Sequence, residues 1–123
     1  MPSKKFCILV AEDDATLSLV VKKELIDAGY DVLVAFDGEK AIALAQSNNI
    51  DMALLDINMP KLNGFDVLRF IKKTFPYVKV IMLTGHADLK NTVEAKLLGA
   101  DDFIGKPYEV EDLLATIDRV LSS

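Results

Sequence analysis

Short apolar runs alternate with longer stretches of helical periodicity along the whole chain. Apolar runs that end at polar or turn residues are typical of strands buried on both faces. The strands predicted in this way are Phe6–Ala11, Asp31–Phe36, Met52–Leu55, Val78–Leu83 and Asp102–Ile104. Apolar residues spaced three and four apart predict helices at Asp14–Ala28, Gly38–Gln46, Gly64–Thr74, Asp88–Leu98 and Val110–Leu121.

The regular alternation predicts an α/β fold built on a parallel sheet with right-handed crossovers. We expect a single doubly wound, five-stranded parallel sheet with strand order 2-1-3-4-5 and five helices on both faces, as in flavodoxin-like folds. The 123 residues are enough for one domain, and no internal repeat or linker divides them. In the predicted Asp88–Leu98 helix, Leu89, Val93 and Leu97 share one face.

Charge and composition exclude several classes of partner. The formal net charge is −5, which argues against a basic nucleic-acid interface and a polybasic membrane anchor. No apolar run approaches the roughly 20 residues that span a bilayer. The lone Cys7 cannot form an internal disulfide, and we expect it to be a small buried apolar side chain. The expectation is a cytoplasmic protein without nucleic-acid or membrane contacts.

Polar residues follow four of the predicted strands. Glu12, Asp13 and Asp14 follow the first strand, Asp56 and Asn58 follow the third, Thr84 follows the fourth and Lys106 follows the fifth. Strands 1, 3, 4 and 5 are neighbours in the predicted order, so these side chains should meet at one edge of the sheet. Two carboxylates about 4 Å apart repel by roughly 4 kcal/mol at an effective dielectric of 20. A divalent cation removes that penalty, and a donor set of oxygens alone suits Mg²⁺.

This cluster favours Mg²⁺-assisted phosphoryl chemistry, with Lys106 and Thr84 as donors to phosphate oxygens. A nucleotide would need a glycine-rich cradle. The candidate segment, 99–107, has one residue too many between its glycines and a proline where Ser or Thr is required. A carboxylate nucleophile that forms an aspartyl phosphate is the better interpretation. Asp56 is the candidate because it stands alone at the end of a central strand.

The chain resembles the receiver domain of two-component response regulators over residues 6 to about 121. The matching features are the acidic pair after the first strand, the segment 56–64, Thr84-Gly85 and Lys106-Pro107. The resemblance implies that Asp56 accepts a phosphoryl group from a sensor histidine kinase or a phosphotransfer protein. Phosphorylation would then switch contacts with a downstream protein, which the sequence does not name.

The resemblance also assigns roles to individual residues. It implies one Mg²⁺ held directly by Asp13 and Asp56, through water by Glu12, and by the backbone carbonyl of Asn58. Thr84 and Lys106 would bind the acyl phosphate, Phe103 occupies the aromatic switch position, and the peptide bond before Pro107 is often cis in the family. Asp14 would serve as the N-cap of the following helix or as an acid in its first turn.

Two residues depart from the common family pattern. Asn63 stands where Asp is frequent, and Phe103 replaces a frequent Tyr, so it has no hydroxyl to donate. His86, the single histidine, has two interpretations: a residue that tunes the lifetime of the acyl phosphate, or a solvated loop residue.

Two other functions are compatible with parts of this pattern. A haloacid-dehalogenase-type phosphatase also forms an aspartyl phosphate, from a D-x-D-x-T/V motif after its first strand. Here Glu12-x-Asp14-x-Thr16 comes close, but glutamate is a poor substitute for the nucleophile. A receiver-like domain that only binds is disfavoured because every functional position is filled. We expect residues 1–123 to form one receiver domain, with no output domain among them.

Overall fold

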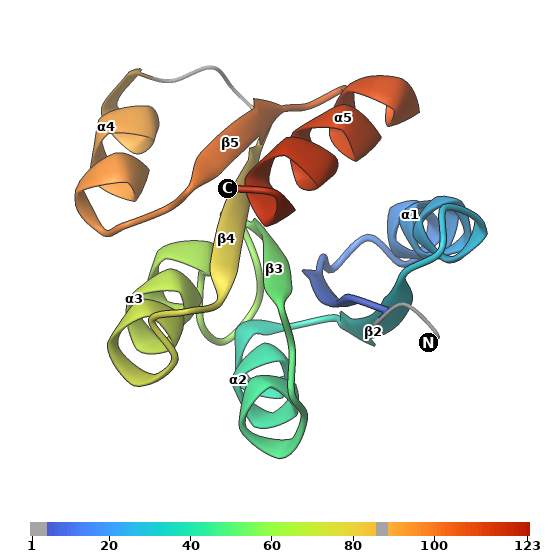
Figure 1. Cartoon of the computed structure of the whole chain (residues 1–123). Helices are drawn as coiled ribbons and strands as arrows, with labels where there is room; N and C mark the ends of the chain where they lie inside the picture. Colours follow the sequence, from blue (N-terminus) through green and yellow to red (C-terminus); the bar gives the residue numbers. More distant parts are fainter. Residues whose placement is uncertain (1–4, 86–88) are drawn as a thin grey trace.

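Residues 5–85 and 89–123 are described by this computed structural model, shown in Figure 1. His86 lies outside the described residues, so both interpretations of it remain predictions. The strands are β1 (Cys7–Ala11), β2 (Asp31–Ala35), β3 (Met52–Asp56), β4 (Lys79–Thr84) and β5 (Asp102–Gly105). The helices are α1 (Ala15–Asp27), α2 (Gly38–Ser47), α3 (Gly64–Thr74), α4 (Leu89–Leu97) and α5 (Val110–Leu121).

The five strands form one parallel sheet with the order β2-β1-β3-β4-β5, which confirms the predicted topology. β1 and β3 lie side by side although α1, β2 and α2 separate them in the sequence. The chain therefore reverses its winding direction between these two strands. The loops that follow them open onto a common edge, which is where a doubly wound fold binds its ligands.

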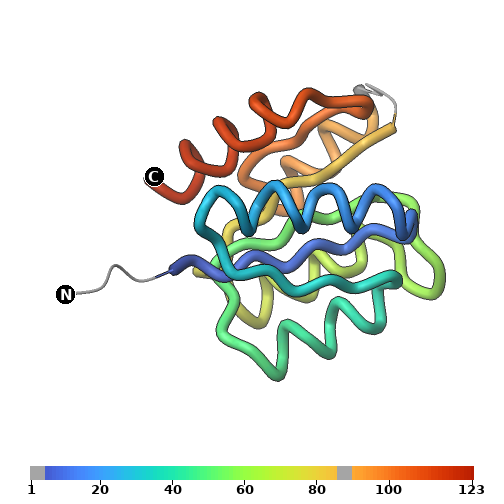
Figure 2. Tube along the Cα trace, turned by 90° about the vertical axis from the view of Figure 1, so that its right-hand side faces the viewer, coloured from blue at the N-terminus to red at the C-terminus, as the bar shows by residue number. Residues whose placement is uncertain are grey.

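Helices cover both faces of the sheet (Figure 1, Figure 2). α1 and α5 lie on one face and share a buried cluster with β1, β3 and β4 that contains Val21, Leu25, Leu113 and Ile117. α2, α3 and α4 cover the opposite face through a second cluster. The central strands carry apolar side chains on both faces because each face is covered, and this explains their unbroken apolar runs.

β3 is one residue longer than the sequence pattern predicts. Asp56 was expected to follow the strand, but it is the last residue of β3 and pairs with Leu83 of β4. The amide of Ile57 then donates to the carbonyl of Leu83 at 3.2 Å, so the ladder continues past the point where the apolar pattern stops. β1 and β2 are each one residue shorter than predicted, because Phe6 and Phe36 lie outside these strands.

The predicted apolar face of α4 is exposed to solvent instead of buried. Val93 and Leu97 lie on one side of the helix as predicted, but their exposed fractions are 47% and 81%. Ala95 of α4 packs into the core, while the larger Val93 and Leu97 side chains lie in solvent.

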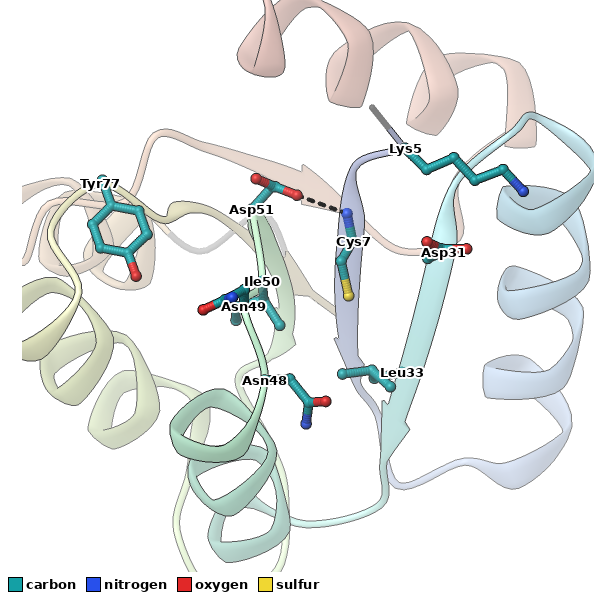
Figure 3. Close-up of a pocket in the computed structure, with 9 residues that line it drawn as sticks. All are labelled: Lys5, Cys7, Asp31, Leu33, Asn48, Asn49, Ile50, Asp51 and Tyr77. Carbon is teal, nitrogen blue, oxygen red and sulfur yellow. Dashed lines mark hydrogen bonds between the residues drawn. The ribbon is translucent and has the colours of Figure 1, made fainter. Parts of the chain in front are cut away.

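A cleft of about 570 Å³ lies at the amino ends of the strands, away from the polar loops (Figure 3). Cys7 lines it and is half-buried, not fully buried as the sequence predicted. The Cys7 amide donates to Oδ2 of Asp51 at 2.8 Å. Burial raises the pKa of the Cys7 thiol, and nearby Asp31 and Asp51 add to this effect. The thiol is therefore protonated at neutral pH and a weak nucleophile.

None of the helices in the described parts of the chain is long and apolar enough to cross a bilayer.

Candidate functional site

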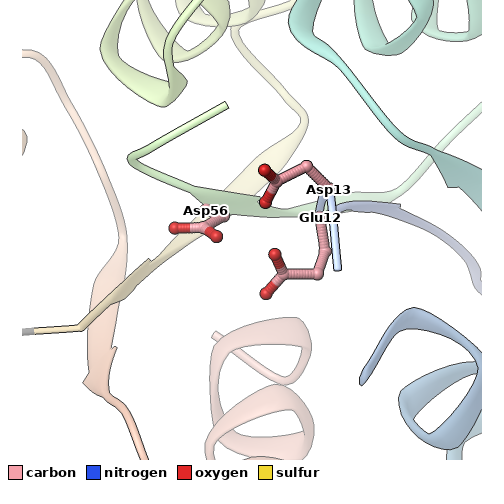
Figure 4. A group of neighbouring side chains, drawn as sticks. All are labelled: Glu12, Asp13 and Asp56. Atoms are coloured by element: carbon pink, nitrogen blue, oxygen red, sulfur yellow. The ribbon is translucent and has the colours of Figure 1, made fainter. Parts of the chain in front are cut away.

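Three carboxylates meet at the carboxyl ends of β1 and β3. Glu12 and Asp13 follow β1, Asp56 ends β3, and one carboxylate oxygen from each lies within 4.8 Å of the other two. Figure 4 shows the three groups turned toward a common space. The predicted meeting of residues distant in the sequence is therefore observed. Glu12 and Asp56 are buried, whereas Asp13 is exposed.

Asp56 is fixed from several directions. It is only 6% exposed, and its Oδ1 accepts a hydrogen bond from the amide of Asn58 at 3.2 Å. Gly64, the first residue of α3, packs directly beneath it: a Cβ at this position would lie 2.3 Å from the carbonyl oxygen of Asp56. The amide of Gly64 donates to the carbonyl of Ile57 at 2.8 Å. The loop between β3 and α3 thus folds tightly around the acid, and a glycine makes this possible.

Glu12 is held at the end of β1. Its amide donates to the carbonyl of Ala35 at 3.0 Å, and its Oε2 accepts from the amide of Asp14 at 3.3 Å. The side chain is buried, and this desolvation is the main cause that raises its pKa to about 7. The neighbouring Asp56 raises the pKa further, while Lys106 lowers it.

Lys106 supplies the positive charge of the site. Its Nζ donates to Oδ2 of Asp56 at 2.9 Å and to Oε1 of Glu12. Burial by itself lowers the pKa of Lys106, but the two carboxylate partners outweigh it and the pKa is raised. The ammonium therefore stays charged and partly offsets the repulsion between the acids.

Thr84 and Phe103 lie next to this charge cluster. Thr84 ends β4, is 5% exposed, and pairs with Gly105 of β5. The amide of Lys106 donates to the carbonyl of Thr84, so the backbone joins the two predicted phosphate donors. Phe103 is 39% exposed and borders the same small cavity as Thr84. Its ring is therefore not part of the core.

Two helix caps position the loops of the site. Asp14 caps α1, because its side chain accepts from the amide of Leu17 at 3.1 Å. Asn63 caps α3 and forms a reciprocal capping box with Asp66. An asparagine oxygen serves this purpose as well as the aspartate that is frequent at this position. The peptide bond between Lys106 and Pro107 is cis.

The structure brings together most of the residues singled out in the sequence, though it leaves their roles as predictions. Glu12, Asp13, Asp56 and Lys106 form one cluster, with the Asn58 amide bonded to it and Thr84 at the neighbouring strand end. The ion pair between Lys106 and Glu12 was not predicted from the sequence. Ser18, a fully buried serine among apolar positions of α1, was not predicted either, although a polar residue at that spacing is a detectable signal.

Comparison with known proteins agrees with this geometry. The family profile described as "Response regulator receiver domain" matches residues 8–118. The chain belongs to this family. The receiver domain is a module of two-component response regulators, so this chain is a signalling domain and not a conventional enzyme. A haloacid-dehalogenase-type phosphatase is not favoured.

Solved structures with the same fold include a CheY-like receiver domain protein from Methanospirillum hungatei. Its TM-score is 0.93 at 34% identity, and the match covers 97% of this chain and 95% of that one. The chemotaxis response regulator CheY4 of Vibrio cholerae matches with a TM-score of 0.90 at 32% identity, over 95% of this chain and 99% of that one.

Curated relatives are longer than this chain. The transcriptional regulatory protein CpxR of Klebsiella pneumoniae is 41% identical over 114 residues, which are 93% of this chain and 48% of the relative. The response regulator ArlR of Staphylococcus saprophyticus is 36% identical over 93% of this chain and 51% of its own length. The chain thus spans about half the length of the curated relatives it matches.

Proposed function

We propose that this receiver domain accepts a phosphoryl group on Asp56 from a phosphohistidine of a sensor histidine kinase or a phosphotransfer protein. The observation that carries the proposal is the contact of Lys106 with Asp56 beside the Glu12 and Asp13 carboxylates. This arrangement holds one buried acid next to a cation and next to further acids that can share a metal ion. A carboxylate so placed is a nucleophile for phosphoryl transfer.

In the transfer step, an Asp56 carboxylate oxygen forms a bond to phosphorus while the phosphorus–nitrogen bond of the phosphohistidine breaks. The electron pair of that bond stays on the imidazole of the donor. Asp56 attacks as the carboxylate, and Nζ of Lys106 donates to its Oδ2 at 2.9 Å. Lys106 then lies where a phosphoryl oxygen on Asp56 requires a donor, and Thr84 ends the neighbouring strand.

The residues present fit a magnesium ion. Their ligand atoms are carboxylate oxygens close enough to surround one small cation, and hard oxygen donors are what Mg²⁺ prefers. Asp13 and Asp56 would bind it directly, Glu12 through water, and Asn58 through its carbonyl. A bound Mg²⁺ supplies charge neutralisation for the phosphoryl oxygens and the acids in the transition state.

The output of the switch is a change in protein contacts. Phosphorylation would shift a two-state equilibrium in which Lys106 and Thr84 bind the phosphoryl oxygens and Phe103 changes its exposure. Phe103 is partly exposed and lines the same narrow crevice as Thr84, so a change at Thr84 can reach its ring directly. A downstream protein would recognise the altered surface. The cytoplasmic location and the extent of the domain over residues 1–123 stay predictions.

The test uses acetyl phosphate as a small phosphoryl donor. We expect intact-protein mass spectrometry to show one added phosphoryl group on the wild type with Mg²⁺ and none after chelation. Asp56→Asn should give no adduct, whereas the exposed matched control Asp27→Asn should react as the wild type does. A wild type that forms no adduct would contradict the proposal and favour a domain that only binds.

A further inference from the structure

Ser18 stands out among the buried polar residues of the described chain. Those residues are Glu12, Ser18, Asp56 and Thr84, and three of the four belong to the phosphorylation site. Ser18 lies instead inside α1, on the face that buries Val21 and Leu25. A serine there is expected to weaken apolar packing, so its hydroxyl needs a compensating partner.

The partner of Ser18 lies outside its own helix. Serine and threonine within helices commonly donate to the carbonyl four residues earlier, as Thr116 does to Asp112 at 2.9 Å. The Oγ of Ser18 donates instead to the carbonyl of Glu12 at 2.9 Å, six residues earlier and beyond the start of α1. This bond joins the rigid helix to the loop that carries the acidic pair.

The bond adds to the other contacts that hold Glu12. Its amide donates to the carbonyl of Ala35, its carboxylate accepts from the amide of Asp14 and from Nζ of Lys106, and its carbonyl accepts from Ser18. Asp13 follows directly, so the direction in which its carboxylate points depends on the peptide that Ser18 fixes. Hydrogen bonds of this kind behind metal ligands determine how well the ligands are oriented.

We infer that Ser18 is a positioning residue that holds the Glu12–Asp13 acidic pair in place for Mg²⁺. The inference rests on the proposed function, because it assumes that this pair binds the ion. It assigns Ser18 no contact with the metal or the phosphoryl group. Its effect passes through the backbone of Glu12.

The test compares Ser18→Ala with two controls. Val21→Ala removes a buried apolar group from the same face of α1, and Thr116→Ala removes a hydroxyl with an ordinary helical partner. Mg²⁺ affinity is measured by isothermal titration calorimetry, and thermal melting reports stability. We expect Ser18→Ala to weaken Mg²⁺ binding about tenfold, the lower end for a group that orients metal ligands. Both controls should stay within about twofold of the wild type, since neither touches the acidic pair.

A second measurement needs no metal. Hydrogen exchange of the Asp14 amide, which donates to Oε2 of Glu12, should accelerate in metal-free Ser18→Ala and remain unchanged in Val21→Ala. Ser18→Thr keeps the hydroxyl and should restore both the slow exchange and the affinity. Agreement of these results would support the inference even if Ser18→Ala is less stable overall.

The outcomes separate this inference from the proposed function. A wild type that binds no Mg²⁺ and forms no acyl phosphate overturns the proposed function, and the inference with it. A wild type that binds Mg²⁺ while Ser18→Ala binds equally well overturns the inference alone. Equal losses in Ser18→Ala and Val21→Ala would also overturn it, because the effect would then follow stability.

Discussion

The Nζ atom of Lys106 lies 2.9 Å from Oδ2 of Asp56, although the two residues are on strands or loops separated by β4. The same ammonium contacts Glu12, which follows β1. Lys106 is thus shared by two buried acids. A divalent ion among the acids would take over part of this charge compensation, because the ion and the lysine would both reduce the repulsion between the carboxylates.

Lys106→Met is expected to slow phosphorylation by acetyl phosphate by at least about tenfold, because it removes a charged donor to the phosphoryl oxygens. It should also raise the pKa of Glu12 above about 7, since Lys106 lowers that pKa in the wild type. Mass spectrometry over time measures the rate, and carbon NMR of the Glu12 carboxyl group measures the pKa.

Lys73→Met is the matched control for this change, because Lys73 is an exposed residue of α3. It should leave both quantities as they are in the wild type. An unchanged Glu12 pKa in Lys106→Met would show that the ion pair does not set the charge state of the site.

Mg²⁺ affinity should depend on pH through Glu12. With a pKa of about 7, Glu12 is largely protonated at pH 6 and largely charged at pH 8. Because the charged form attracts the ion, affinity should rise by up to about tenfold between these pH values and then level off. Calorimetric titrations at several pH values measure this, and buffers of different ionisation enthalpy count the protons released.

Glu12→Gln isolates this effect. The variant should bind Mg²⁺ more weakly at pH 8 and should lose the rise in affinity around pH 7, because glutamine does not titrate. If the rise persists in Glu12→Gln, another group is responsible for it.

Gly64→Ala should destabilise the fold by about 1–3 kcal/mol through overpacking. The new Cβ would lie 2.3 Å from the Asp56 carbonyl oxygen, and both atoms belong to backbone segments that cannot move easily. Urea unfolding measures the loss. Gly85→Ala, where a Cβ meets nothing within 4 Å, should change stability by less than about 0.5 kcal/mol. Equal stability of the two variants would show that the loop can yield.

The order of strands and the meeting of polar residues at one edge were predictable because both follow from alternation. Five apolar runs, each followed by a helix, leave few topologies, and the order places the ends of β1 and β3 side by side. That placement was enough to bring Asp13 and Asp56 together from residues far apart in the chain. The α1 cap at Asp14 was predictable for the same kind of local reason.

Other features depend on tertiary distances that sequence spacing does not contain. The pairing of Lys106 with Glu12 requires the lysine to reach across β4 and β3. Val93 and Leu97 are exposed, whereas Ala95 of the same helix packs into the core. Helical periodicity shows that residues share a face, but not whether that face is covered.

β5 is an outermost strand and has a neighbouring strand on one side only. Such a strand is normally the part of a sheet that loosens first. Here Lys106, which follows β5, donates a hydrogen bond to Asp56 at the end of the central strand β3. A phosphoryl group on Asp56 would change what Lys106 contacts. A modification at one oxygen atom would therefore alter the contact that holds the edge strand β5 to the centre of the sheet. The exposed ring of Phe103, three residues before Lys106, lies on the same edge strand.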